Sequence, residues 1–179
     1  LPVALPDLSP YRPGTMLERG LLTLSGKFEL DSLLISRHPE RGLDSLPTYT
    51  APLSPDPAAW PMILCAGARI PNALHSRLHD QPWERSLRPR PQAEISLEDA
   101  RTLGVEAGDC LEISTPFGSI RLEAAPTQTV RQGEVYVFHG YREADVNRIL
   151  DPDNLDPYSG FPAFRSAYCR IRRCEAYEN

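Results

Sequence analysis

Apolar and polar positions alternate in short runs along the second half of the chain. The alternation has a period of two, which is typical of half-buried strands. It is found in the runs QAEIS (92–96), CLEIS (110–114), IRLEA (120–124), VYVFH (135–139) and AFRSAYCRIRR (163–173). The unbroken apolar run MILCA (62–66) predicts a further, buried strand. The pattern therefore predicts a mainly β domain.

Turn and cap signals between these runs define the connections. TPFGS joins two of the runs as a β-hairpin, with Ile120, Leu122 and Ala124 on one face and Cys110, Glu112 and Ser114 facing inward on the other strand. Ser96 and Gly104 cap a two-turn helix over 96–104, with Asp99 in the capping-box position. Shorter helical pieces are expected at 71–80, after Pro71, and at 144–150. The sum is a small β-barrel with short inserted helices.

The first 60 residues have a different character. They hold nine of the 19 prolines, which favours extended and irregular backbone. Residues 21–35 alternate loosely around a Ser-Gly pair, which predicts a hairpin or two short strands. We therefore expect an extended arm over 1–60, a compact barrel over 61–174 and a tail over 175–179. Because the chain begins without Met, we also expect it to be a piece of a longer protein.

Composition excludes several classes of protein. The net charge is −5, which argues against a nucleic-acid partner. No apolar run approaches the roughly 18–20 residues of a membrane span, so we expect no membrane contact. The cysteines lie at positions 65, 110, 169 and 174, with no C-x-x-C pair and no histidine set beside them. We expect four reduced, partly buried thiols and no metal site.

Five motifs in chain order resemble one known family. The segments TLSGKFEL (23–30), MILCAGARIPNALHSR (62–77), PWERSLRPRPQAEISLEDARTLGVEAGDCLEISTPFGSIRLEA (82–124), VFHGY (137–141) and NRILDPDNLDPYSGFPAFRSAYCRIRR (147–173) carry the resemblance. They are similar to the C-terminal, molybdopterin-dinucleotide-binding domain of the dimethyl-sulfoxide-reductase family of molybdenum and tungsten oxidoreductases, most of all to its acetylene hydratase and thiosulfate-reductase-like branch. Each motif alone is weak, but five in order over about 150 residues are specific.

The resemblance implies a fold, a cofactor and partners. The fold would be a double-psi β-barrel of the aspartate-decarboxylase type. The domain would hold the guanine dinucleotide and pterin part of a bis-molybdopterin guanine dinucleotide cofactor, with molybdenum or tungsten held by the full-length enzyme. It would have no catalytic residue of its own, and the isolated fragment would be inactive and without cofactor. Its partners would be the preceding domains of the polypeptide and an iron–sulfur subunit, in a prokaryotic protein of the cytoplasm or the periplasm.

The first motif carries the chemistry that a pyrophosphate needs. Gly67 lets the backbone come close to a ligand, flanked by the small Ala68, and Arg69 can pair with a phosphate. His75 and Ser76 are candidate hydrogen-bond partners for phosphate or pterin at the start of the expected helix. The structural alternative is that Gly67 only turns the chain and the polar residues are solvated. Arginines outnumber acids over 69–90, where they occupy positions 69, 77, 85, 88 and 90.

Four later positions complete the candidate site by resemblance. His139 and Tyr141 could flank a flat ring, with Gly140 between them allowing close approach. Asn147 and Arg165 stand where the family places residues near the pterin or the guanine. Asp156 could hold a guanine edge or only make a turn with Ser159 and Gly160. The candidate cofactor-binding residues are Gly67, Ala68, Arg69, His75, Ser76, Arg77, His139, Gly140, Tyr141, Asn147 and Arg165.

Two other functions stay open at this stage. The aspartate decarboxylase barrel cuts itself at a Gly-Ser bond, and Gly118-Ser119 is such a pair. The same pair also suits the turn of an ordinary hairpin. The other possibility is a stand-alone interaction module with the same barrel, against which the resemblance of 23–30 to the family's preceding segment argues.

Overall fold

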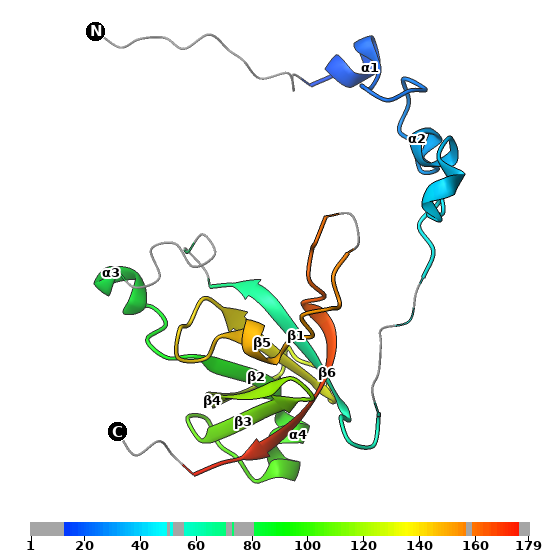
Figure 1. Cartoon of the computed structure of the whole chain (residues 1–179). Coiled ribbons are helices and arrows are strands. Elements are labelled where there is room, and N and C mark those ends of the chain that lie inside the picture. The colour runs from blue at the N-terminus through cyan, green and yellow to red at the C-terminus, as the bar shows by residue number, and fades with distance from the viewer. Residues whose placement is uncertain are drawn as a thin grey trace, which may run out of the picture. The chain divides into compact units, whose positions relative to one another are not determined.

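The computed structural model separates the chain into two units, Leu1–Ala51 and Pro52–Asn179 (Figure 1). The residues that it describes are 13–49, 51, 56–70, 73, 81–156 and 159–175. No helix among these described residues is long and apolar enough to cross a membrane.

The first unit contains short helices and turns. They are α1 (Thr15–Arg19), α2 (Leu33–Ser36) and the 3-10 helix η1 (Pro39–Arg41). The hairpin or strands expected over 21–35 are wrong: the amide of Gly26 donates to the Thr23 carbonyl at 3.1 Å, and the amide of Leu21 donates to the Gly26 carbonyl at 3.0 Å. These bonds close a local loop. The leucines around it are exposed, so no packed face exists here to stabilise a strand pair.

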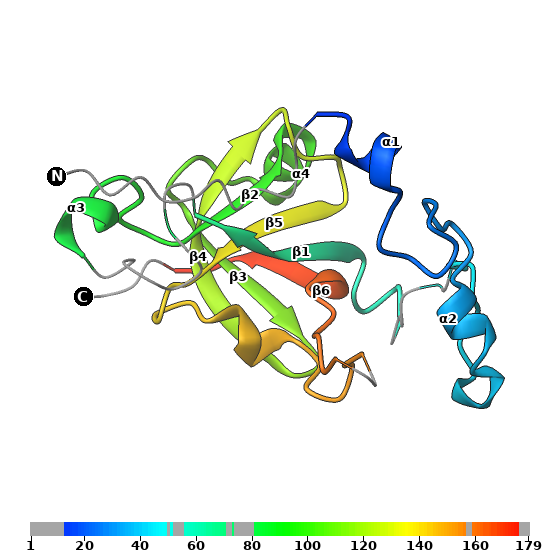
Figure 2. The same cartoon turned by 90° about the horizontal axis from the view of Figure 1, so that it is seen from above.

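The second unit is a closed barrel of six strands, seen from two directions in Figures 1 and 2. The strands are β1 (Met62–Arg69), β2 (Gln92–Ser96), β3 (Cys110–Thr115), β4 (Gly118–Thr127), β5 (Glu134–His139) and β6 (Arg165–Arg173). Their order around the barrel is β1-β5-β2-β4-β3-β6. β1 pairs with β5 and β2 with β4 in parallel, and the other pairs are antiparallel. This is the mainly β, double-psi barrel that the sequence and its resemblance predicted.

The barrel interior is filled by one apolar face of each strand. Leu64, Ile95, Leu111, Ile113 and Val137 have no exposed surface. The predicted face of β4 is confirmed, because its alternate apolar residues are buried. The predicted face of β3 is wrong. Leu111 and Ile113 fill the core, and the intervening residues point to the outside of the sheet, because in a strand only one of the two alternating sets can face the interior.

A carboxylate lies on this outer face of β3. Glu112 pairs across the sheet with Arg121 of β4 on one side and Arg172 of β6 on the other. Its carboxylate accepts from Arg172 Nε at 2.9 Å and lies 3.6 Å from Arg121 Nε. The two guanidinium groups cover the carboxylate, which explains a buried acid outside the core.

Short helices decorate the barrel where the caps predicted them. α4 (Leu97–Leu103) starts at Ser96, whose side chain accepts from the Asp99 amide, and ends at Gly104 in the left-handed region. The helical turn expected at 144–150 is the 3-10 helix η2 (Val146–Ile149). A short helix that the sequence did not predict, α3 (Pro82–Arg85), precedes β2. The helix expected at 71–80 lies almost wholly outside the described residues.

The expectation of four reduced thiols is wrong for two of them. Cys110 and Cys174 form a disulfide between the start of β3 and the residue after β6. These strands are neighbours, paired at Leu111 and Arg173, so their ends bring two cysteines 64 positions apart into bonding range. Cys65 and Cys169 are free thiols. The spacing of Cys110 and Cys174 in the sequence gave no sign of the disulfide, because these two cysteines meet only when β3 and β6 are neighbours in the barrel.

Candidate functional site

A pocket of about 880 Å³ opens at one rim of the barrel, and we call it the rim pocket. It is lined by Gly67, Ala68, Arg69, His139, Gly140, Tyr141, Arg142, Asp145, Val146, Asn147, Phe161, Phe164 and Arg165. Three guanidinium groups and one carboxylate belong to this set. The pocket is therefore suited to an anion that also carries flat or polar groups.

The strand arrangement explains why these residues meet. β1 and β5 run parallel, so their carboxyl ends lie at the same rim, with Arg69 beside His139. β6 runs antiparallel to β1 and begins at this rim, with Arg165 opposite Cys65. The loop that follows β5 leads to η2 and carries Asn147 into the same place. Segments about 70 and 100 positions apart in the sequence thus form one site.

Eight of the eleven predicted site residues line this pocket. They are Gly67, Ala68, Arg69, His139, Gly140, Tyr141, Asn147 and Arg165. The other three, His75, Ser76 and Arg77, lie outside the described residues. The assignment of individual residues to a ligand stays a prediction, but the predicted loops do converge.

Gly67 has a structural reason to be glycine. It lies at a bulge in β1, where the pairing with β5 shifts between Cys65 and Ala68, and its φ is +85°. A Cβ built there would lie 2.9 Å from both Cβ and Cγ of Phe164. The backbone of Phe164 is also fixed to β1, because its carbonyl accepts from the Ala66 amide at 2.8 Å. The missing side chain of Gly67 therefore makes room for Phe164 on the wall of the rim pocket.

Tyr141 is held from several directions. It is almost fully buried, and its hydroxyl donates to the Arg88 carbonyl at 3.0 Å. The guanidinium of Arg85 lies over its ring, 5.0 Å from the centroid. Burial raises the pKa of the hydroxyl, so it stays a neutral donor. Tyr141 thus forms a fixed wall of the pocket with its polar end already bonded.

The loop before η2 presents an acid and an amide together. The carboxylate of Asp145 accepts from the backbone amide of Asn147 at 3.0 Å and from its side-chain amide at 2.9 Å. This cap fixes the orientation of the Asn147 side chain. The carboxamide therefore stands as an ordered polar group in the pocket.

The sequence missed five of the lining residues. They are Arg142, Asp145, Val146, Phe161 and Phe164. Arg142 follows the HGY motif directly and Asp145 stands three positions later, so extending that motif by four residues would have found both. Phe161 and Phe164 lie in the segment 147–173 that carries the resemblance, but neither was singled out as a site residue, because a phenylalanine in a loop cannot be told from a core residue until the loop is placed.

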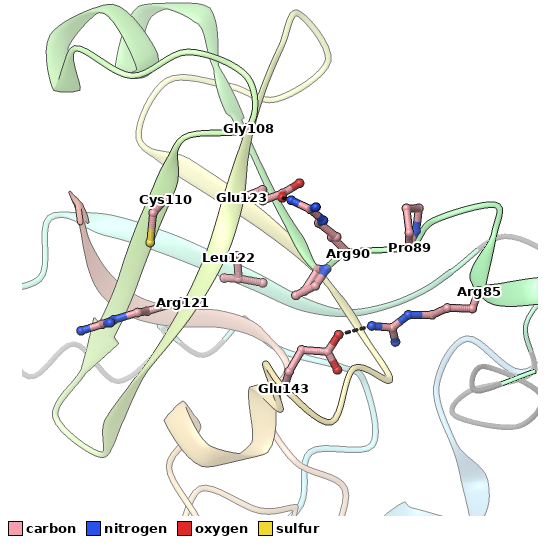
Figure 3. Close-up of a pocket in the computed structure, with 10 residues that line it drawn as sticks. Arg85, Pro89, Arg90, Gly108, Cys110, Arg121, Leu122, Glu123 and Glu143 are labelled. Carbon is pink, nitrogen blue, oxygen red and sulfur yellow. Dashed lines mark hydrogen bonds and ion pairs between the residues drawn. The ribbon is translucent and has the colours of Figure 1, made fainter. Parts of the chain in front are cut away.

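Of the other arginines in the basic stretch, Arg85, Arg88 and Arg90 do not line the rim pocket, and Arg77 lies outside the described residues. A second cavity of about 540 Å³ is lined by Arg85, Arg90, Arg121 and their neighbours (Figure 3). In this cavity Arg85 forms an ion pair with Glu143, and Arg90 Nη1 lies 2.6 Å from Glu123 Oε1. Arg88 stacks on Phe138, 4.4 Å from the ring centroid. Arg69 therefore lies in the rim pocket, whereas Arg85, Arg88 and Arg90 have partners within the protein.

The loop before β6 answers the question about Asp156. One oxygen of its carboxylate accepts from both the amide and the hydroxyl of Ser159 at 2.7 Å. Its backbone carbonyl accepts from the Gly160 amide at 2.8 Å. Asp156 therefore makes a turn, the second of its two predicted roles.

The free thiols are not poised for chemistry. Burial raises the pKa of Cys169 to about 12, so it is protonated at neutral pH. Burial also raises the pKa of Cys65, whose thiol is hydrogen-bonded to Tyr136. The described residues hold no group of three His, Cys, Asp or Glu side chains that could bind a metal.

Fold and pocket together define a class of protein. The double-psi barrel brings arginines, the backbone at two glycines and an ordered carboxamide together at one rim. Such a donor set suits the phosphates and heterocyclic edges of a dinucleotide.

The family follows from comparison with known proteins. Residues 62–168 match the model of the Molydopterin dinucleotide binding domain family, and the chain belongs to that family. Dopamine dehydroxylase from Eggerthella lenta is 31% identical over 170 residues, which span 85% of this chain and 17% of the relative. Acetylene hydratase from Syntrophotalea acetylenica is 29% identical over 82% of this chain and 23% of its own length.

A solved structure agrees with this assignment. Acetylene hydratase from Pelobacter acetylenicus superposes with a TM-score of 0.72 at 26% identity. The match covers 87% of this chain and 24% of that protein, so the chain spans less than a quarter of the relatives it resembles. The chain is thus a binding domain for a molybdopterin-type cofactor, as its resemblance implied.

The self-processing alternative is not favoured. Gly118 pairs with Thr115 at the start of β4, and Ser119 pairs with Ser114, so both are part of a regular hairpin. The stand-alone module is not favoured either, because the chain belongs to a dinucleotide-binding domain family and matches a part of much longer relatives.

Proposed function

We propose that the rim pocket holds the guanine dinucleotide part of a bis-molybdopterin guanine dinucleotide cofactor, within a larger molybdenum or tungsten oxidoreductase. One observation carries the proposal. Eight residues singled out in four separate segments of the sequence line one pocket. Four segments picked without regard to a shared function would line the same pocket only by chance.

The chemistry of the lining supports this ligand. Arg69 and Arg165 line the pocket, and a guanidinium can bind a pyrophosphate through two parallel N–H groups. The carboxamide of Asn147 can donate to and accept from the edge of a guanine or pterin. Tyr141 and His139 give the pocket a flat wall. The cofactor supplies the metal and the redox chemistry, and these residues bind and orient it.

The first unit supports a place inside a larger polypeptide. Many of its described apolar side chains are exposed, among them Leu17, Leu22, Phe28 and Tyr49. The alignment with dopamine dehydroxylase covers 85% of the chain, more than Pro52–Asn179 contains, so it reaches into this unit. We propose that these side chains pack on preceding domains of the parent protein, which would also provide the metal ligand and the contact with an iron–sulfur subunit.

The test is the cofactor content of the full-length parent protein with Arg69→Ala and Asn147→Ala. The pterin is quantified by fluorescence after oxidation, and the nucleotide by chromatography after acid hydrolysis. We expect both variants to lose at least half of the bound cofactor while the folded protein is recovered in normal yield. Arg101→Ala is the matched control, because Arg101 is an exposed arginine of α4 outside the rim pocket. Full cofactor content in both pocket variants would overturn the site.

A further inference from the structure

Phe161 is an exposed aromatic side chain at the rim pocket. It lines the pocket, yet 65% of its surface is accessible. Its segment lies in the orange loop that projects from the barrel where β6 begins (Figure 1). A single exposed phenylalanine needs no partner by itself, but this one adjoins a pocket and offers an apolar, aromatic face to a ligand bound there.

Hydrogen bonds hold the backbone of Phe161, and a second aromatic ring supports its side chain. The Phe161 carbonyl accepts from the Asp156 amide at 2.9 Å, and its amide donates to the Ser159 hydroxyl at 3.3 Å. Its ring meets the ring of Phe164 edge to face, with centroids 5.7 Å apart and planes at 82°. Phe164 in turn packs where Gly67 has no side chain. Phe161 is therefore a positioned surface, supported by Phe164 and the bulge of β1.

The charges of the pocket indicate which kind of ligand would meet this aromatic surface. Arg69, Arg142 and Arg165 line the pocket with a single acid, Asp145. Guanidinium groups bind phosphate, and an aromatic face binds a flat heterocycle by stacking. The combination is the one that a nucleotide-like ligand requires, with its ring at one end and its phosphates at the other.

We infer that Phe161 is the stacking surface for a fused heterocyclic ring of the dinucleotide, either its guanine or its pterin. The inference rests on the proposed function and extends it, because it assigns a ring contact to a residue that was not among the predicted site residues. The arginines then bind the pyrophosphate, and burial of the Phe161 face adds affinity only for ligands that carry a ring.

The experiment measures binding of three probes to the 179-residue chain by calorimetry. GDP carries guanine and pyrophosphate, 6-carboxypterin carries a pterin and an acid, and inorganic pyrophosphate carries no ring. Phe161→Ala is compared with Phe161→Trp, which keeps a stacking face. Phe117→Ala is the matched control, because Phe117 is an exposed phenylalanine in the β3–β4 turn outside the pocket.

We expect Phe161→Ala to weaken the binding of one ring probe by about 5- to 100-fold, the range of one lost stacking contact. Pyrophosphate binding should change by less than about twofold, and Phe161→Trp should restore ring binding. The probe that responds identifies the ring. Unchanged binding of both rings in Phe161→Ala, or equal weakening of pyrophosphate, overturns the stacking role. Failure of the unaltered chain to bind any of the three probes would overturn the stacking role, whereas the proposed function is decided separately by the cofactor content of the full-length parent protein.

Discussion

Replacement of Gly67 by alanine should destabilise the barrel by more than its backbone angle alone explains. Gly67 has a φ of +85°, where an L-residue costs about 1–2 kcal/mol. The new Cβ would also lie 2.9 Å from two carbons of Phe164, well inside van der Waals contact. Overpacking of this kind adds about 1–3 kcal/mol. We expect the free energy of unfolding to fall by about 2–5 kcal/mol in total.

Gly104 provides the matched control. Its φ is +64°, but no atom lies within 4 Å of its built Cβ, so Gly104→Ala measures the backbone penalty without the clash. Urea unfolding followed by tryptophan fluorescence and circular dichroism gives both values. The Gly67→Ala variant should lose at least about 1 kcal/mol more than Gly104→Ala. Phe164→Ala in the same chain should remove most of this difference, because the clashing ring is gone. Equal losses in the two glycine variants would refute the packing role of Phe164.

Four other predictions concern single contacts. Glu84 is 2% exposed, and neither of its carboxylate oxygens has a hydrogen-bond partner among the described residues. Glu84→Leu should therefore raise the free energy of unfolding by about 1–3 kcal/mol. The control Glu106→Leu, at an exposed position, should change it by less than about 0.5 kcal/mol. Reduction of the Cys110–Cys174 disulfide should lower this free energy by about 2–4 kcal/mol, and Cys110→Ala with Cys174→Ala should make it insensitive to dithiothreitol. Arg85→Met should lower the free energy of unfolding by about 1–2 kcal/mol, because the guanidinium over the Tyr141 ring and its ion pair with Glu143 are both lost. A double-mutant cycle with Glu143→Gln should give a coupling energy of under about 1 kcal/mol for the ion pair. Cys169, with a pKa raised to about 12 by burial, should resist iodoacetamide in the folded protein at pH 8 and react only after unfolding; labelling of the native protein would contradict its burial.

The sequence by itself determined the elements that depend on neighbours along the chain. The period of two in 110–114 and 120–124 predicted the β3–β4 hairpin, because alternate side chains of a strand share a face. Ser96 and Gly104 predicted the ends of α4, because a cap acts within one helical turn. The order of five short motifs predicted the family and most of the rim pocket.

Only the tertiary structure decided which distant residues meet. The Cys110–Cys174 disulfide depends on β3 and β6 being neighbours, which no local pattern states. The inward face of β3 was misjudged because alternation gives two faces and only the closed barrel selects one. Phe161 and Phe164 became part of the site because the loop before β6 returns to the bulge of β1 at Gly67. Local order follows from short-range sterics and hydrogen bonds, whereas the site depends on strand pairings across about 100 residues, which exist only after the barrel has closed.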